Sequence, residues 1–353
     1  MMKIAYVAHM NTSPEDGVVK KVIDHVRQWE KAGHVVQLFL VSRTGVVCDA
    51  LKPLNPRVYI STRHYHALGR LTIMGMHISQ WRPDIVYGRV GMFLPYMLFL
   101  PRKTPFVIEV NGNQLVEYKV TETQRAYAYF VRTRNLMLRR AAGFVCVAHY
   151  LDDLYRPYQK PTVVISNGID LAKYQVLPVS SETKPHLIYV GSHQAWQGIE
   201  QMFALARRFP DWHFDLVGIN GEGLEIPPNV ICYGFKPFKE YVSLMARAHV
   251  AIGALATSVR GTPESSLLKV REYLANGLPI ILPAPDTDFI EPVSFIYKSS
   301  SEFNSEDNYV GLSNFVQVWM GQRVPRESIM HIDAGKKEAS RLAFFEQVLR
   351  PAL

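Results

Sequence analysis

The sequence has little cysteine and no long apolar run. Only three cysteines occur among 353 residues, at positions 48, 146 and 232. So few and so widely spaced thiols argue against a disulfide framework or a cysteine zinc site, and they suit a reducing cytosol. The longest apolar run, Met92–Leu100, contains a proline and is much shorter than the roughly 20 residues that cross a bilayer. We therefore expect no transmembrane helix, and the short apolar start of the chain is typical of a strand rather than a signal peptide.

Acidic residues are scarce in the first half of the chain. Residues 1–165 hold 22 Lys and Arg against 11 Asp and Glu, whereas residues 166–353 hold 17 against 20. The formal net charge of +8 therefore lies entirely in the first half. This imbalance favours an anionic partner for that half, and nucleic acid, an anionic membrane surface and a phosphorylated substrate all fit it. The 48% hydrophobic content is that of a globular protein, and the length suits two domains.

Two segments show the pattern of a strand, a turn and a helix that together form half of a Rossmann-like domain. In the first segment these elements occupy residues 3–7, 11–17 and 18–29. In the second they occupy residues 186–190, 191–198 and 199–208. Each segment leads into another strand, as a βαβ unit requires. Two such units predict an α/β protein with two doubly wound domains rather than one long sheet.

The boundary between these domains is expected in the polar, proline-flanked stretch 165–185. We assign residues 1–165 to the first domain and 166–336 to the second, with a final amphipathic helix at 337–348. Further strands are expected at residues 35–41, 84–87, 106–110, 143–148, 214–217, 230–233, 250–253 and 279–282. Further helices are expected at residues 121–140 and 267–275.

One stretch in the second half carries the densest set of functional groups. Glu264 lies in a predicted loop and Glu272 follows eight residues later, in a predicted helix. A carboxylate accepts two hydroxyl hydrogen bonds at once, which suits a sugar or a ribose. The helix start near Leu268 would bind phosphate through backbone N–H groups, and Arg260 and Lys269 would add positive charge. The alternative is a surface helix in which Lys269 and Glu272 form an i, i+3 pair.

A second candidate position is Gly17, which follows the first strand and precedes the first helix. A residue without a Cβ atom allows backbone N–H groups to approach a phosphate closely. The alternative is an ordinary glycine in a turn between a strand and a helix.

Taken together, these motifs resemble those of retaining glycosyltransferases of the GT-B fold, of the family 4 type. The matching segments are DGVVKKVIDHVRQWEKAGHVV, PDIVYGR, TPFVIEVNG, AAGFVCVAHYL, VVISNGID, LIYVGSHQAWQGIE and NVICYGF. The most specific match is Glu264-x7-Glu272 followed by YLANGLPII. The resemblance implies two Rossmann-like domains facing a cleft, the first for the acceptor and the second for the donor. It also implies that the C-terminal helix, about 337–353, returns to the first domain.

The implied reaction moves a sugar from a nucleoside diphosphate to an acceptor hydroxyl and keeps its anomeric configuration. The resemblance implies no metal ion and no cofactor besides the nucleotide-sugar donor. By the family pattern, Glu264 would hold hydroxyls of the donor sugar and Glu272 the ribose. The backbone amides of Leu268 and Gly17 would contact the diphosphate. The two residues implied near the nucleotide base are Phe235 and Lys236.

Two departures from the family pattern concern charged or titratable groups. Many relatives carry Arg after the first glycine of the second βα turn and Lys before its second glycine, whereas this chain has Ser192 and Gln197 there. Because a diphosphate in a dry cleft needs cations, we expect replacements, with Lys269 and Arg260 first and His193 after them.

The second departure lies in the acceptor domain, where Asn111 stands in place of the usual His. Asn cannot act as a base, but it can orient a hydroxyl. Glu109 and Glu117 flank it, and either carboxylate could accept a proton. The alternatives are a strand-end carboxylate for Glu109 and a solvated helix residue, which we favour, for Glu117.

Two other signals concern metal and membrane. Asp286-Thr287-Asp288 has the spacing of a metal motif found in glycosyltransferases of the other major fold, but the order of elements favours a turn. The helix predicted at 121–140 is basic and amphipathic with aromatic residues, which suits peripheral contact with an anionic membrane as well as an ordinary solvated face.

The resulting hypothesis is a cytoplasmic glycosyltransferase, in part peripheral on the inner membrane, that builds bacterial surface polysaccharide, lipopolysaccharide or glycolipid. Its partners would be a nucleotide sugar and a glycan or lipid-linked acceptor. The alternative is a non-catalytic nucleotide-sugar or glycan binding protein on the same scaffold. Nucleic acid is not expected as a partner, because no basic-aromatic recognition motif accompanies the positive charge.

Overall fold

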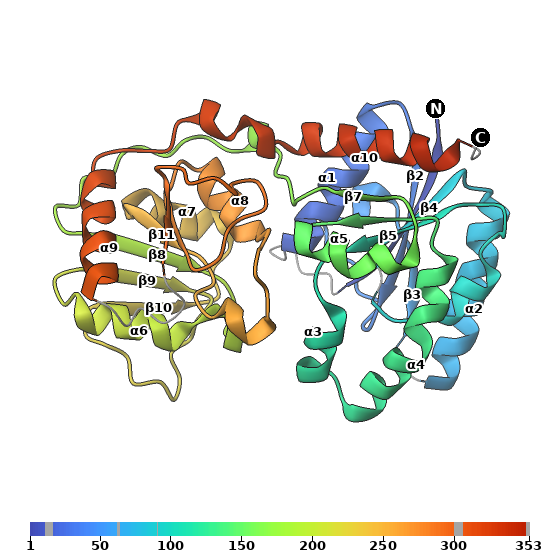
Figure 1. Ribbon diagram of the computed structural model, residues 1–353, viewed down its shortest axis with the longest axis horizontal. Helices are drawn as coiled ribbons and strands as arrows, with labels where there is room; N and C mark the ends of the chain where they lie inside the picture. The colour runs from blue at the N-terminus through green and yellow to red at the C-terminus, as the bar shows by residue number, and fades with distance from the viewer. Residues whose placement is uncertain (11–16, 62–63, 90, 300–305, 351–353) are drawn as a thin grey trace. The chain divides into compact units, whose positions relative to one another are not determined.

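The computed structural model describes residues 1–10, 17–61, 64–89, 91–299 and 306–350. The chain forms two compact units. The first contains Met1–Ser166 together with the C-terminal segment from Ala334, and the second contains Asn167–Asp333. Each unit is a parallel sheet with helices on both of its faces, which confirms the predicted fold class (Figure 1).

The first unit contains a seven-stranded parallel sheet in the order β3-β2-β1-β4-β5-β6-β7. Its strands are β1 (Lys3–His9), β2 (Val35–Ser42), β3 (Arg57–Ile60), β4 (Ile85–Arg89), β5 (Phe106–Val110), β6 (Gly143–Cys146) and β7 (Thr162–Val164). The central strands are almost fully buried, as their near-continuous apolar sequences require. The strand order reverses between β1 and β4, so the carboxyl ends of these strands form the crevice in which such folds bind ligands.

Helices cover both faces of this sheet. They are α1 (Gly17–Lys31), α2 (His64–Trp81), α3 (Gln114–Thr121), α4 (Gln124–Arg140), α5 (His149–Tyr155) and α10 (Ala334–Leu349). The buried face of α1, which includes Val22 and Trp29, packs with Phe345 of α10 on one side of the sheet. The opposite side is covered by α2, α4, α5 and the 3₁₀ turn η2 (Pro95–Phe99). The C-terminal helix therefore completes the first unit, as the family resemblance implied.

The second unit contains a six-stranded parallel sheet in the order β10-β9-β8-β11-β12-β13. Its strands are β8 (His186–Val190), β9 (His213–Val217), β10 (Val230–Gly234), β11 (Val250–Ile252), β12 (Ile280–Leu282) and β13 (Ile296–Lys298). Its helices are α6 (Ile199–Arg208), α7 (Phe238–Arg247), α8 (Leu268–Ala275) and α9 (Glu306–Trp319). Here the strand order reverses between β8 and β11, which places the ligand crevice at the end of β8.

The helix predicted at residues 121–140 is present as α4, which begins three residues later, at Gln124. Glu122 and Thr123 adopt extended backbone and separate it from α3, a short helix that was not predicted. The Thr123 hydroxyl accepts a hydrogen bond from the Ala126 N–H at 3.3 Å and so caps the start of α4. The turn predicted at 11–17 lies outside the described residues except for Gly17, where α1 begins.

Candidate functional site

Three glycines lie at the carboxyl edge of the second sheet. Gly191, Gly218 and Gly234 follow or end the neighbouring strands β8, β9 and β10. The Gly218 N–H donates to the Gly234 carbonyl at 2.7 Å, and a Cβ atom on Gly218 would lie 2.3 Å from the Gly191 carbonyl oxygen. Gly218 and Gly234 also have positive φ angles, which favour glycine. Glycine is therefore required at this edge of the sheet, because the ends of the neighbouring strands pack backbone against backbone.

Lys269 of α8 supplies a positive charge at the end of β8. Its Nζ atom lies 4.0 Å from the centroid of the Tyr189 ring and donates a hydrogen bond to Gln197 Oε1 at 2.8 Å. A Cβ atom on Gly191 would lie 2.5 Å from the same nitrogen. Among the described residues, no carboxylate forms an ion pair with Lys269. The i, i+3 pair between Lys269 and Glu272, considered as an alternative above, does not form.

The surroundings of Lys269 favour the neutral form of its side chain. Burial lowers the pKa of its ammonium group to about 7. An ammonium group with this pKa is only partly protonated at neutral pH, and a nearby anion favours its protonated, charged form. Lys269 and the backbone N–H groups at the start of α8 thus form a site of positive charge beside Gly191.

Glu272 lies one helical turn further along α8, in a different environment. Its carboxylate accepts a short hydrogen bond from the Tyr241 hydroxyl of α7 and a longer one, at 3.5 Å, from the Tyr174 hydroxyl. The α8 helix itself is held against the sheet because the Tyr273 hydroxyl accepts a hydrogen bond from the Val190 N–H at 2.7 Å. Glu272 is therefore oriented as a hydrogen-bond acceptor near the end of β8.

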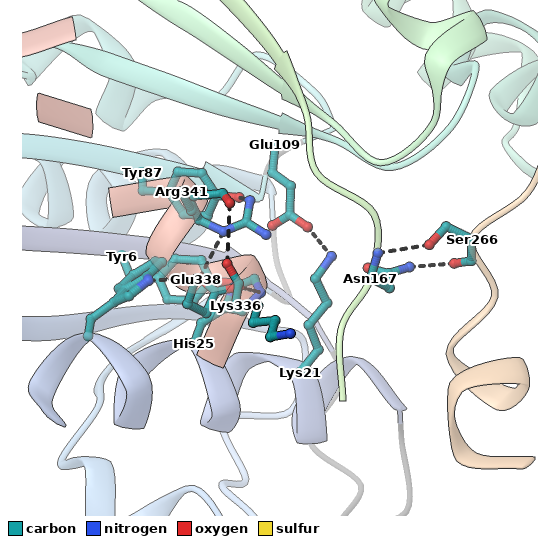
Figure 2. Close-up of polar contacts among 12 residues, drawn as sticks. Tyr6, Lys21, His25, Tyr87, Glu109, Asn167, Ser266, Lys336, Glu338 and Arg341 are labelled. Carbon is teal, nitrogen blue, oxygen red and sulfur yellow. Dashed lines mark hydrogen bonds and ion pairs between the residues drawn. The ribbon is translucent and has the colours of Figure 1, made fainter. Parts of the chain in front are cut away.

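Glu264 lies in the loop before α8 and is only 8% exposed. The next residue, Ser265, fixes the loop because its N–H donates to the Pro285 carbonyl at 3.0 Å. Ser266 binds the segment that opens the second unit: its hydroxyl accepts from the Asn167 N–H at 2.8 Å, and its carbonyl accepts from the Asn167 side chain (Figure 2). The SNGID motif therefore holds the Glu264 loop in place.

A fully buried arginine connects these loops. Arg271 of α8 donates two hydrogen bonds to the Asp286 carboxylate, at 2.9 and 2.8 Å, and lies 2.8 Å from an Asp288 carboxylate oxygen. Its Nε atom donates to the Asn167 carbonyl at 2.7 Å. Asp286 and Asp288, the two aspartates of the Asp-x-Asp motif, are thus bound to the Arg271 guanidinium. In the described part of the chain, no three His, Cys, Asp or Glu side chains gather as a metal site would require.

The remaining predicted donor-site residues lie at separate places. Leu268 is the first residue of α8, and His193 is exposed in the loop after β8. Arg260 ends the 3₁₀ turn η6 (Thr257–Arg260), and its side chain lies outside what the structure describes. Phe235 is 69% exposed directly after β10, and Lys236 pairs with Glu240 at 3.0 Å.

In the first unit, the predicted residues Glu109 and Asn111 lie at the carboxyl end of β5. Lys21 of α1 binds both of them: its ammonium forms a short ion pair with Glu109 (Figure 2) and donates a hydrogen bond to Asn111 Oδ1 at 3.2 Å. Burial opposes the charge of Glu109, but Lys21 and other nearby cations outweigh it and hold the pKa of this carboxyl well below its usual range. A carboxylate of such low pKa is a weak base, so the structure favours an orienting role over proton abstraction. Gly17 begins α1, the helix that carries Lys21.

This ion pair belongs to a larger buried polar cluster that sequence reasoning missed. On α10, Glu338 accepts hydrogen bonds from Arg341 Nε at 2.9 Å and from the Trp29 indole at 2.7 Å. Arg341 also donates to the Tyr87 hydroxyl at 2.6 Å, and His25 lies 3.2 Å from Glu338. In the sequence Glu338 and Arg341 look like an ordinary i, i+3 surface pair, and no local signal shows that both are buried.

Comparison with known proteins gives the class of fold and then a family match over part of the chain. Solved structures show that the chain has the fold of the GT-B glycosyltransferases. A glycosyltransferase from Rickettsia africae ESF-5 superimposes with a TM-score of 0.70 at 14% identity, with 99% of each chain covered. Residues 16–173 match the model of the family described as Glycosyltransferase Family 4.

Two further solved structures share the fold over nearly the full length of the chain. The lipopolysaccharide outer core galactosyltransferase WaaB has a TM-score of 0.64 at 13% identity, with 98% of this chain and 99% of that chain covered. The Anabaena protein Alr3699/HepE, solved with UDP and glucose, has a TM-score of 0.60 at 15% identity, with 99% and 98% covered. No curated protein matches by sequence.

Proposed function

We propose that the protein is a retaining glycosyltransferase that moves a sugar from a nucleoside diphosphate to an acceptor hydroxyl without a metal ion. The observation that carries this proposal is the ammonium of Lys269, which has no carboxylate partner among the described residues and lies at the ligand edge of the second sheet. The family match and the UDP-bound neighbour support the reaction class.

The donor diphosphate binds at the start of α8 in this proposal. Lys269 and the Leu268 N–H neutralise its phosphates, and Glu272 accepts hydrogen bonds from the ribose, in part in place of its long contact with Tyr174. Glu264 accepts hydrogen bonds from the donor sugar. Phe235, exposed at the end of β10, lies against the base. Arg260, His193, Lys236 and the Gly17 amide remain further proposed donor contacts.

In this proposal, the sugar transfer is promoted by positive charge near the leaving diphosphate. As the sugar leaves with oxocarbenium character, negative charge develops on the diphosphate, and a fixed cation with a helix N-terminus stabilises that charge more than it stabilises the bound donor. Lys269 thereby does the work that the cations missing at Ser192 and Gln197 do in relatives. The acceptor hydroxyl is oriented by Asn111 and, through Lys21, by Glu109.

Isothermal titration of the full chain with UDP, GDP and ADP tests the donor site. At least one nucleotide should bind, and Glu272→Ala should weaken binding because the ribose loses a charged acceptor. Glu327→Ala, at an exposed carboxylate of the second unit, is the matched control. Failure of all three nucleotides to bind the wild-type chain would overturn the proposal.

A second candidate is a non-catalytic nucleotide-sugar or glycan binding protein. The absence of cations at Ser192 and Gln197 favours it, because a site built only to hold a donor needs less stabilisation of the departing diphosphate. The two candidates differ in one outcome: an enzyme slowly hydrolyses its donor when no acceptor is present, whereas a binding protein does not.

We also propose that the first unit docks on an anionic membrane surface through α4, at the cytoplasmic face, during synthesis of surface polysaccharide, lipopolysaccharide or glycolipid. Five exposed residues follow one face of this helix at spacings of three and four: Arg125, Tyr129, Arg132, Leu136 and Arg139. We call them the α4 stripe. Leu136 is 59% exposed and Tyr129 is 43% exposed, so apolar groups stand between the charges, which suits an interface of lipid headgroups. None of the described helices is both long and apolar enough to span a bilayer.

A further inference from the structure

Three neighbouring strands of the first sheet end in side chains that can bind a ligand. His9 ends β1, Arg89 ends β4, and Glu109 lies next to the end of β5. In the sheet register Ala8 pairs with Arg89, and Gly88 pairs with Ile108, so Arg89 lies between the other two strand ends. This is the crevice where the strand order reverses.

Two other cations described in this region are already paired. Lys21 binds Glu109, and Arg341 binds Glu338 and the Tyr87 hydroxyl. Arg89, in contrast, makes no ion pair or hydrogen bond with any residue that the structure describes, although its Nε atom is buried. A buried donor without an acceptor is costly, and native structures rarely keep one without a reason.

The positive charge of Arg89 affects the pKa of a neighbouring side chain. Burial and the nearby guanidinium together lower the pKa of His9 to about 4, so its imidazole is neutral at physiological pH. The His9 Nε2 atom is also buried and has no partner among the described residues. The ring packs edge-on against Tyr96, with the two centroids 5.9 Å apart, and its position is therefore fixed.

We propose that Arg89 binds an oxyanion carried by the acceptor, with His9 as a second hydrogen-bonding contact. This inference rests on the proposed function, since it places the acceptor hydroxyl at Asn111, directly after the neighbouring strand β5. A guanidinium presents two parallel N–H groups to a phosphate or carboxylate, which makes Arg the side chain best matched to such a group. The acceptor class is then a phosphorylated or acidic sugar rather than a neutral one.

A structural role for Arg89 would look different in this fold. Arg140 donates to the Pro101 carbonyl at 2.8 Å, and Arg323 donates to the carbonyls of Pro178, Ala246 and Ala248. Such arginines tie backbone segments together. Arg89 binds no described carbonyl, so its charge is available to a ligand.

Calorimetric titration of the full chain with four probes tests the inference: glucose, glucuronate, glucose 6-phosphate and inorganic phosphate. The variants are Arg89→Gln, Arg89→Lys and, as a control on an exposed arginine of the same unit, Arg43→Gln. Glucuronate or glucose 6-phosphate should bind at least tenfold more tightly than glucose. Arg89→Gln should abolish that preference, Arg89→Lys should keep part of it, and Arg43→Gln should keep all of it.

Any of three results would overturn the inference. The first is that the anionic sugars bind no better than glucose, and the second is that the Arg89→Gln variant keeps the preference for them. The third is that inorganic phosphate binds as tightly as glucose 6-phosphate. The third result would mean that the sugar hydroxyls of the acceptor contribute nothing to its binding affinity. Titration of UDP, GDP and ADP on the same proteins separates this inference from the donor site, because Arg89→Gln should leave nucleotide affinity unchanged.

Discussion

At the scale of single residues, the position of one positive charge decides the donor site. Lys269 Nζ and Gln197 Oε1 are 2.8 Å apart, so a cation placed at either position reaches nearly the same point. Lys269→Gln should weaken nucleoside diphosphate binding about 10- to 100-fold, since a hydrogen bond to a charged group contributes about 1.5–3 kcal/mol. Titration calorimetry measures this, with Lys239→Gln on the exposed face of α7 as the control.

The double variant Gln197→Lys/Lys269→Gln should recover most of the lost affinity, because it moves the charge without removing it. A double variant as weak as Lys269→Gln would show that the site needs the lysine on α8 itself. Equal affinity of Lys269→Gln and the wild-type chain would exclude Lys269 from the donor site.

Donor binding should also depend on pH through the same residue. The pKa of Lys269, lowered to about 7 by burial, means that the free site is charged below pH 7 and increasingly neutral above it. Affinity for the nucleoside diphosphate should therefore fall as pH rises from about 7 to 9, with proton uptake on binding over that range. Titrations in buffers of different ionisation enthalpy detect this uptake, and in Lys269→Gln both effects should disappear. A pH-independent affinity in the wild-type chain would contradict the assignment.

At the scale of elements, α10 is joined to the first unit by a buried polar cluster as well as by apolar packing. Glu338 is 3% exposed and accepts hydrogen bonds from both Arg341 and the Trp29 indole. Glu338→Ala leaves the Arg341 guanidinium buried without its carboxylate, which typically costs about 3–5 kcal/mol. Urea unfolding should show a loss of this size. Glu346→Ala, on the exposed face of the same helix, should change the stability of the first unit very little.

The exposed α4 stripe leads to a prediction about membrane binding rather than about stability. Arg125→Gln/Arg132→Gln/Arg139→Gln should reduce binding to vesicles of anionic phospholipid, because each basic residue near such a surface contributes about 1 kcal/mol. Vesicle co-sedimentation measures this, and nucleotide affinity should remain unchanged. Arg140 is not part of the test, because its contact with the Pro101 carbonyl gives it a structural role. Undiminished binding of the triple variant would contradict the membrane proposal.

At the scale of the whole chain, periodicity alone predicted the α/β class, since apolar strands alternate with amphipathic helices. The start of α4 was placed three residues too early because Glu122 and Thr123 interrupt no apolar pattern, and only the Thr123 cap marks it. For the site, sequence reasoning named Lys269, but its contact with Gln197 depends on how α8 packs against β8. Arg89 and Glu338 gave no local signal, because the groups around them come from distant parts of the chain.

The central claim is that the chain turns over a nucleotide sugar. Its most direct test is release of nucleoside diphosphate from a panel of UDP-, GDP- and ADP-sugars, with wild type, Glu264→Gln and Lys269→Gln compared. We predict slow release from at least one donor without acceptor, and slower release in both variants, Glu264→Gln losing turnover more than nucleotide affinity. Tight binding of a donor with no release under any condition would contradict the claim and favour the non-catalytic alternative.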